Sequence, residues 1–174
     1  MVSYSLITQE DLPQIIYLHE TYLNSGSYIR STIAGAFMAG KYVGYKACDG
    51  NKIIGFLSVQ EGIIFTYPHE ELEKHIHTLV CEREIYTVDG IIVLEEYRNR
   101  GIAGELIRLM KEYVLKRKEC MVLIEMWIYP DGMIPAEKPL IGLGDVIYQE
   151  AIPMFYHNIQ MYGIECPICG TSCK

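Results

Sequence analysis

The sequence has no hydrophobic run long enough to cross a membrane, no excess of basic residues and no internal repeat. The 15 lysines and arginines are outnumbered by 22 acidic residues, giving a net charge of −7. This balance argues against general nucleic-acid binding and against attraction to an anionic membrane surface, and it is compatible with a cationic or amine substrate. The first residues, MVSYSLITQEDL, contain neither a basic segment nor a long apolar one. We therefore expect no signal peptide and a cytoplasmic location.

Two common nucleotide-binding motifs are also absent. The sequence contains neither Gly-x-Gly-x-x-Gly nor Gly-Lys-Ser/Thr, which argues against a Rossmann turn and a P-loop. Half of the 174 residues are hydrophobic and 21% are charged, a composition typical of a globular domain with a hydrophobic core.

The order of the predicted elements indicates a mixed sheet. Helical periodicity predicts a first helix over residues 8–23, and residues 24–40 are compatible with a second, shorter one. The segments 42–47 and 53–59 form a predicted hairpin around Asp49-Gly50-Asn51. After a predicted helix over residues 68–84, a strand (84–94), a helix (from 101) and an apolar strand (120–129) follow. We therefore expect an α/β (mixed α+β) fold, with a mixed β-sheet flanked by helices in a single domain.

The stretch EEYRNRGIAGELIRLM, residues 95–110, places two arginines and two glycines where a helix begins. The first N–H groups of a helix lack intrahelical partners and carry the positive end of the dipole, so they favour an anion. Gly101 and Gly104 let the backbone approach a bulky ligand, and Arg98 and Arg100 add mobile positive charge. The pattern predicts a pyrophosphate site. The alternative is a solvated basic turn before an ordinary amphipathic helix.

The segment Arg98-Asn99-Arg100-Gly101-Ile102-Ala103 resembles the Arg/Gln-x-x-Gly-x-Gly/Ala signature of the GNAT superfamily of N-acetyltransferases. The preceding strand, Val88 to Val93, also resembles that family's central strand. The resemblance covers roughly Tyr4 to Tyr162, with an insertion around Thr66–Glu84. It implies a splayed mixed sheet, with residues 1–162 as an acyltransferase domain and residues 163–174 as a cysteine-rich tail.

The resemblance also implies how acetyl-CoA would bind. Its pyrophosphate would lie on the backbone N–H groups of Arg98, Asn99, Arg100, Gly101, Ile102, Ala103 and Gly104. Its pantetheine arm would pair with the strand edge at Ile91, Ile92 and Val93. The N–H of Val93 is the expected donor to the thioester oxygen, which it would polarise.

Acetyl transfer requires an amine that has lost its proton and a leaving thiolate that is stabilised or protonated. In the family's C-terminal helix a tyrosine often protonates the thiolate, and Tyr156 is the natural match, although it lies one residue further from Ala151 than usual. Asp89 and Glu125 are candidate bases, with Asp89 also a candidate amine anchor, because a carboxylate in an apolar strand is costly unless paired or functional. All three are alternatively structural residues, and family members often deprotonate the amine through a chain of waters.

The chain ends in GIECPICGTSCK, where Cys166 and Cys169 have the spacing of a zinc knuckle and Cys173 is a third candidate ligand. Structural zinc takes four ligands, and the fourth would be His157, a residue of a second chain or one lying beyond this segment. A flexible tail without metal is the alternative, and a cysteine that relays the acyl group is a remote one.

Two functions are therefore compatible with the sequence. The first is transfer of an acetyl group from acetyl-CoA to a primary amine of a small molecule or peptide, with no nucleic-acid or membrane partner. The second is a non-catalytic acyl-CoA-binding sensor or interaction module, which stays open because Gln160 and Met161 replace the family's glycine and phenylalanine. A homodimer is compatible with either function, since dimers are common in the family.

Overall fold

The computed structural model describes residues 1–23, 26–62, 74, 78, 84–116, 120–124, 126, 133–134 and 137–145; for residues 26–31 and 115 it describes the backbone alone. Its strands are β1 (Val2–Leu6), β2 (Tyr42–Asp49), β3 (Lys52–Glu61), β4 (Glu84–Val93) and β5 (Cys120–Leu123). Its α-helices are α1 (Leu12–Tyr22), α2 (Gly26–Met38), α4 (Ile102–Leu115) and α5 (Glu137–Ile141). Short 3-10 turns precede α1 (Gln9–Asp11) and follow β4 (Glu95–Tyr97).

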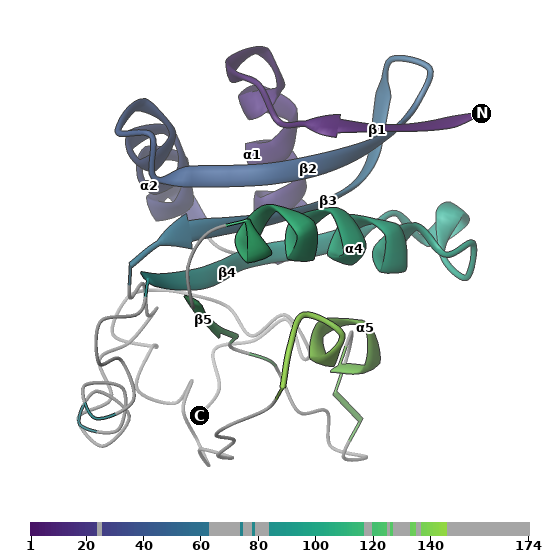
Figure 1. Ribbon diagram of the computed structural model, residues 1–174. Coiled ribbons are helices and arrows are strands. Elements are labelled where there is room, and N and C mark those ends of the chain that lie inside the picture. Colours follow the sequence, from purple (N-terminus) through teal and green to yellow (C-terminus); the bar gives the residue numbers. More distant parts are fainter. Residues whose placement is uncertain are drawn as a thin grey trace, which may run out of the picture.

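The five strands form one mixed sheet in the order β1-β2-β3-β4-β5 (Figure 1). The first three neighbouring pairs are antiparallel, and β4 pairs with β5 in parallel. The predicted hairpin is present as β2–β3, with Gly50 at a φ of 58° in its turn, a conformation that glycine adopts without strain. The fold class expected from the sequence is therefore confirmed.

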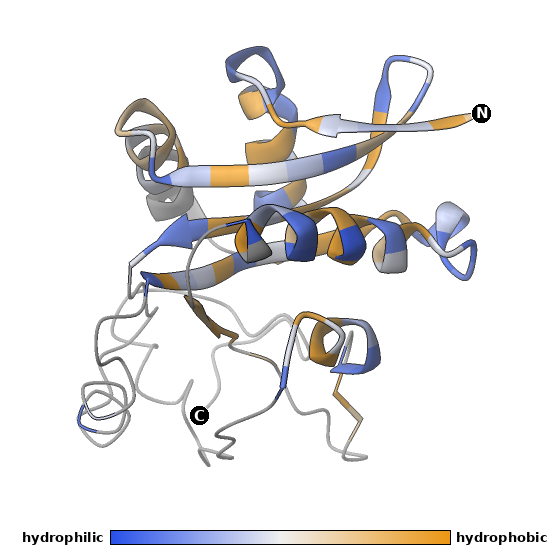
Figure 2. Cartoon of the chain, in the orientation of Figure 1, coloured by the Kyte–Doolittle hydropathy of each residue, from blue (hydrophilic) through white to orange (hydrophobic). Residues whose placement is uncertain are grey.

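Helices cover both faces of the sheet (Figure 1). Helix α4 packs on one face against β2, β3 and β4, while α1 and α2 pack on the other. Apolar residues recur along α4 between polar ones (Figure 2). Five of the apolar residues are buried in the hydrophobic core, namely Ile102, Leu106, Ile107, Met110 and Val114. No helix in the described ranges is long and apolar enough to span a membrane.

The parallel pair opens after a short run of pairing. Residues Glu84–Thr87 of β4 pair with Cys120–Leu123 of β5. Beyond Thr87, β4 continues to Val93 and pairs only with β3 among the described strands. The other edge of β4 over residues 88–93 thus carries backbone groups that no described strand covers, as the splayed sheet of the resemblance implies.

Candidate active site

The turn before α4 has the geometry of an anion site. Asn99 has a φ of 60° and Gly101 a φ of 79°, so two residues of this turn are left-handed. Gly101 is the N-cap of α4, and the N–H of Glu105 bonds to its carbonyl oxygen at 3.1 Å. The N–H groups of residues 102–104 precede this first helical hydrogen bond, so they have no acceptor within the helix. They and the positive end of the helix dipole converge on the space beside the turn.

The described residues leave space beside the two glycines of this turn. A Cβ added to Gly101 or Gly104 would meet no heavy atom of those residues within 4 Å. Neither glycine is therefore needed for close packing inside the protein. The positive φ at Gly101 explains why this residue is a glycine. Gly104 has an ordinary helical conformation, so a glycine there is consistent with a ligand that approaches the start of α4.

The two arginines of the turn are held by its own backbone. Arg98 Nε donates to the carbonyl oxygen of Val93 at 3.1 Å, and Arg100 Nη2 donates to that of Glu96 at 2.7 Å. The guanidinium of Arg100 also lies 5.1 Å from the centre of the Tyr97 ring. The sequence suggested mobile charge, but both side chains brace the turn while keeping further N–H donors for an anion. Arg98 thereby links the turn before α4 to the end of β4.

The tip of the β2–β3 hairpin supports the same turn. The Tyr97 hydroxyl donates to Asp49 Oδ2 at 3.0 Å, and Lys52 Nζ lies 3.0 Å from Glu96 Oε1. Lys52 also lies 5.7 Å from the centre of the Tyr97 ring. Sequence reasoning missed these contacts, because they join segments about fifty positions apart and no motif links them.

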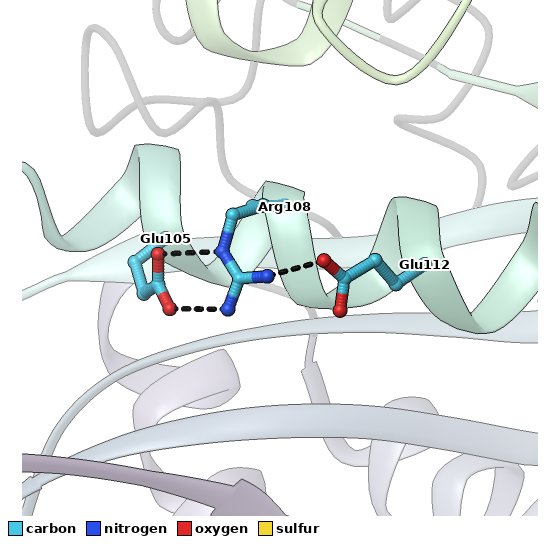
Figure 3. A network of polar contacts seen from close by, with 3 residues as sticks. All are labelled: Glu105, Arg108 and Glu112. Carbon is cyan, nitrogen blue, oxygen red and sulfur yellow. Dashed lines mark hydrogen bonds and ion pairs between the residues drawn. The ribbon is translucent and has the colours of Figure 1, made fainter.

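A charged network on α4 removes a potential conflict with a bound anion. Glu105 lies in the first turn, where its carboxylate would repel a phosphate. Arg108 holds it through two hydrogen bonds, from Nε to Oε2 at 2.9 Å and from Nη2 to Oε1 at 2.7 Å, and also bonds to Glu112 (Figure 3). The hydrogen bonds from Arg108 lower the pKa of Glu105. The carboxylate is therefore paired along the outer face of the helix.

Asp89 is the extra residue of a bulge in β4. Ser58 pairs with Gly90 and Val59 with Val88, so two neighbouring residues of β3 face three of β4. The bulge lies just beyond the point where β4 and β5 part. Asp89 and Gly90 consequently both approach the face that α1 covers, instead of alternating across the sheet as in a regular strand.

Three side chains surround the Asp89 carboxylate, which is 7% exposed. Gln60 Nε2 donates to Oδ1 at 2.6 Å, and the Ser58 hydroxyl donates to Oδ2 at 3.3 Å. His19 Nε2, on the fully buried imidazole from α1, lies 3.0 Å from Oδ2. The sequence singled out Asp89 as an acid in an apolar strand, and the structure places its side chain in the interior. Sequence reasoning missed His19 and Gln60, because their meeting requires α1 to cross β3 and β4.

Tyr42, on β2, is a further polar residue on this side of the sheet and is 5% exposed. Burial raises the pKa of its phenol far above the ordinary value, and the Asp89 carboxylate raises it further. Tyr42 therefore stays neutral in the physiological range and adds no second negative charge beside Asp89.

The structure brings together part of the predicted site. Ile91, Ile92 and Val93 pair with Leu57, Phe56 and Gly55 of β3, which leaves their opposite edge toward the opening between β4 and β5. This edge leads directly into the turn at residues 98–104. Glu125, Tyr156, His157 and the three tail cysteines lie outside the described residues. Of the helix predicted over 68–84, the structure describes Lys74 and Thr78, which are helical, and Glu84, which begins β4 instead of ending a helix. Within the described part of the chain, no cluster of three or more His, Cys, Asp or Glu side chains is suited to a metal ion.

Comparison with known proteins agrees with this geometry. The sequence profile of the acetyltransferase (GNAT) family matches residues 13–136, which is more than half of the chain. The chain therefore belongs to the GNAT acetyltransferase family, whose members typically use acetyl-CoA. A search of curated protein sequences gave no significant match.

Solved structures support the fold independently. An aminoglycoside acetyltransferase, AAC(6')-Iy in complex with a bisubstrate analogue, is 13% identical with a TM-score of 0.62, and the match covers 87% of this chain and 95% of that one. AAC(6')-Ih, an aminoglycoside antibiotic 6'-N-acetyltransferase from Acinetobacter baumannii, is 13% identical with a TM-score of 0.60 over 87% and 95% of the two chains. Ribosomal-protein-alanine N-acetyltransferase from Brucella melitensis biovar Abortus 2308 is 16% identical with a TM-score of 0.56 over 89% and 100%. At these identities the likeness concerns the fold.

Proposed function

We propose that this GNAT-family protein transfers the acetyl group of acetyl-CoA to a primary amine by direct attack of the amine on the thioester. The observation that carries the proposal is the continuity of two features: the uncovered edge of β4 and the open N-terminus of α4. Together they offer hydrogen-bond partners to an extended amide-containing arm and, next to it, N–H donors to a pyrophosphate. Acetyl-CoA has these two parts in this order.

The residues divide the chemistry as follows. N–H groups of residues 98–104 hold the pyrophosphate, and the edge at Ile91, Ile92 and Val93 pairs with the pantetheine arm. An N–H on that edge, which we assign to Val93, polarises the thioester carbonyl so that the nitrogen can attack it. Asp89 anchors the amine or accepts its proton, directly or through water, with Glu125 as the other candidate base. Tyr156 protonates the departing thiolate, and the products are an acetylated amine and CoA.

The acceptor is best sought among amine-rich small molecules and peptide amines. The structural neighbours include enzymes named for acetylating aminoglycosides and a ribosomal-protein alanine. The net charge of −7 favours a cationic acceptor over an anionic one by long-range attraction. A panel of aminoglycosides, polyamines and short peptides with free N-termini covers these classes.

The first experiment is calorimetric titration with acetyl-CoA, CoA and ATP. We expect dissociation constants on the order of micromolar for both CoA forms and much weaker binding of ATP. Arg100→Glu is expected to weaken CoA binding by roughly 30-fold or more, because it places a carboxylate beside the pyrophosphate and removes the brace to Glu96. Equal affinity of Arg100→Glu and the wild type for CoA would rule out the anion site at this turn.

Tyr156→Phe tests the general acid. We expect kcat to fall roughly 10- to 100-fold with the acceptor that the panel identifies, while the affinity for acetyl-CoA stays unchanged. Wild-type kcat in this variant would remove Tyr156 from the mechanism. CoA binding without turnover across the whole panel would instead favour a non-catalytic acyl-CoA sensor.

A further inference from the structure

The polar cluster beneath the β4 bulge connects a helix on one face of the sheet to the strand that the reaction uses. It consists of His19 on α1, Ser58 and Gln60 on β3, and Asp89 on β4. All four side chains lie in the interior, with His19 and Ser58 at 0%, Gln60 at 2% and Asp89 at 7% exposure. The reaction as described above uses Asp89 and leaves His19 and Gln60 without a role.

His19 occupies a position where the helix pattern calls for an apolar side chain. It follows Ile15 by four residues, so the two lie on the same face of α1, and Ile15 is fully buried. The imidazole packs against the Phe56 ring, with 5.0 Å between ring centres, and places Nε2 3.0 Å from Asp89 Oδ2. A leucine here would serve helix packing equally well, so packing alone does not explain a histidine.

Gly90 makes room for this histidine. A Cβ on Gly90 would lie 2.7 Å from Cε1 of His19 and 2.9 Å from Cδ1 of Leu23, closer than real Cβ contacts occur. The bulge turns both Asp89 and Gly90 toward α1, so one residue supplies the carboxylate and the next supplies the space. The histidine therefore fits only because the bulge places a glycine beside it. His19, the bulge and Gly90 are called the His19 set below.

The His19 set lies next to the part of β4 that is proposed to bind acetyl-CoA. The bulge begins one residue beyond Thr87, the last residue of β4 that pairs with β5, and it immediately precedes Ile91. A bulge bends its strand and sets the direction of the residues that follow. His19 on α1 and the two side chains from β3 hold Asp89 in place. These contacts therefore fix the direction in which the N–H groups of Ile91 to Val93 face the opening between β4 and β5.

We propose that His19 is a positioning residue for acyl transfer. Acting through Asp89 and the β4 bulge, it aligns the strand edge that polarises the thioester carbonyl. This inference rests on the proposed function, because it concerns the same strand edge. It adds a residue on the opposite face of the sheet that no motif identifies.

The test uses acetyl-CoA labelled with ¹³C at the thioester carbonyl, whose chemical shift on binding reports polarisation without any acceptor. The intact chain is compared with His19→Leu, which fills the space without a polar group, and His19→Gln, which keeps an N–H donor. Tyr17→Gln, at a position on α1 whose side chain is 61% exposed, is the matched control. Calorimetry gives the affinity of each variant for acetyl-CoA.

We expect His19→Leu to lose roughly half or more of the shift change on binding, with an affinity within about threefold of the wild type. His19→Gln should recover most of the change, and Tyr17→Gln should match the wild type. If His19 has a purely structural role, His19→Leu should instead lower the thermal stability and the affinity for acetyl-CoA. The carbonyl shift change of the acetyl-CoA that still binds should then equal that of the wild type. This combination of results would overturn the inference.

Gly90→Ala keeps the test decisive if His19→Leu does not fold. It displaces the imidazole while leaving the chemistry of both side chains intact, and it should reduce the shift change as His19→Leu does. A full wild-type change in folded Gly90→Ala would overturn the inference. Absence of acetyl-CoA binding by the wild-type protein is a separate result, since it would overturn the proposed function itself and this inference with it.

Discussion

Gly104→Leu is expected to weaken acetyl-CoA binding by roughly 100-fold, equivalent to about 2.7 kcal/mol, while making the free protein more stable. A Cβ at Gly104 meets no heavy atom within 4 Å in the part of the chain that the structure describes, so that part leaves room for a side chain there. Leucine is a much better helix former than glycine, and we expect the free energy of unfolding to rise by about 0.5 kcal/mol. The larger side chain would, however, occupy the space that the first N–H groups of α4 face. If Gly104→Leu raises the free energy of unfolding and lowers the affinity for acetyl-CoA, the glycine serves ligand binding and not the stability of the fold.

Gly35→Leu is the matched control for this prediction. Gly35 lies in α2, and a Cβ there also meets nothing within 4 Å. Its substitution should stabilise the helix similarly and leave CoA binding unchanged. Urea denaturation and calorimetric titration of the two variants give all four values. Undiminished affinity in Gly104→Leu would mean that the ligand does not approach the start of α4.

The features that the sequence predicted are those that local chemistry determines. Gly50 marks the turn of the β2–β3 hairpin, and the two predicted strands lie on either side of it. Gly101 precedes α4, where the sequence predicted a helix start, and the apolar spacing from Ile102 onward predicts the buried face of the helix. Each of these depends on neighbours within a few positions, so the sequence alone indicates them.

The features that the sequence did not predict depend on contacts between distant segments. His19 belongs to no motif of the sequence, and Gly90 lies inside the predicted strand 84–94. Their fit appears only when α1 is packed across β4, with a bulge that shifts the alternation of side chains at Asp89. The same holds for Tyr97 and Asp49, whose hydrogen bond joins the hairpin tip to the turn before α4.

The buried cluster also gives the largest expected effect on stability. Asp89→Ala should lower the free energy of unfolding by about 3–5 kcal/mol, because Gln60 would lose the buried acceptor of its hydrogen bond and His19 the carboxylate that lies 3.0 Å from its Nε2. Replacing all three together, as His19→Leu, Gln60→Met and Asp89→Leu, leaves no such group from these side chains. Of the cluster, the triple variant keeps only the Ser58 hydroxyl, so it should regain most of the loss, since apolar replacements of buried charged groups and their partners are often neutral or stabilising.

Urea denaturation of the single and triple variants measures this recovery, and the carbonyl shift of bound acetyl-CoA measures function in the same proteins. We expect stability to return in the triple variant while the shift change of the bound thioester does not. A triple variant as unstable as Asp89→Ala would show that the cluster is required for the fold. Recovery of stability without recovery of the shift would separate the two roles: an apolar core suffices to hold α1 on the sheet, and the polar cluster is kept because it aligns β4 for the reaction.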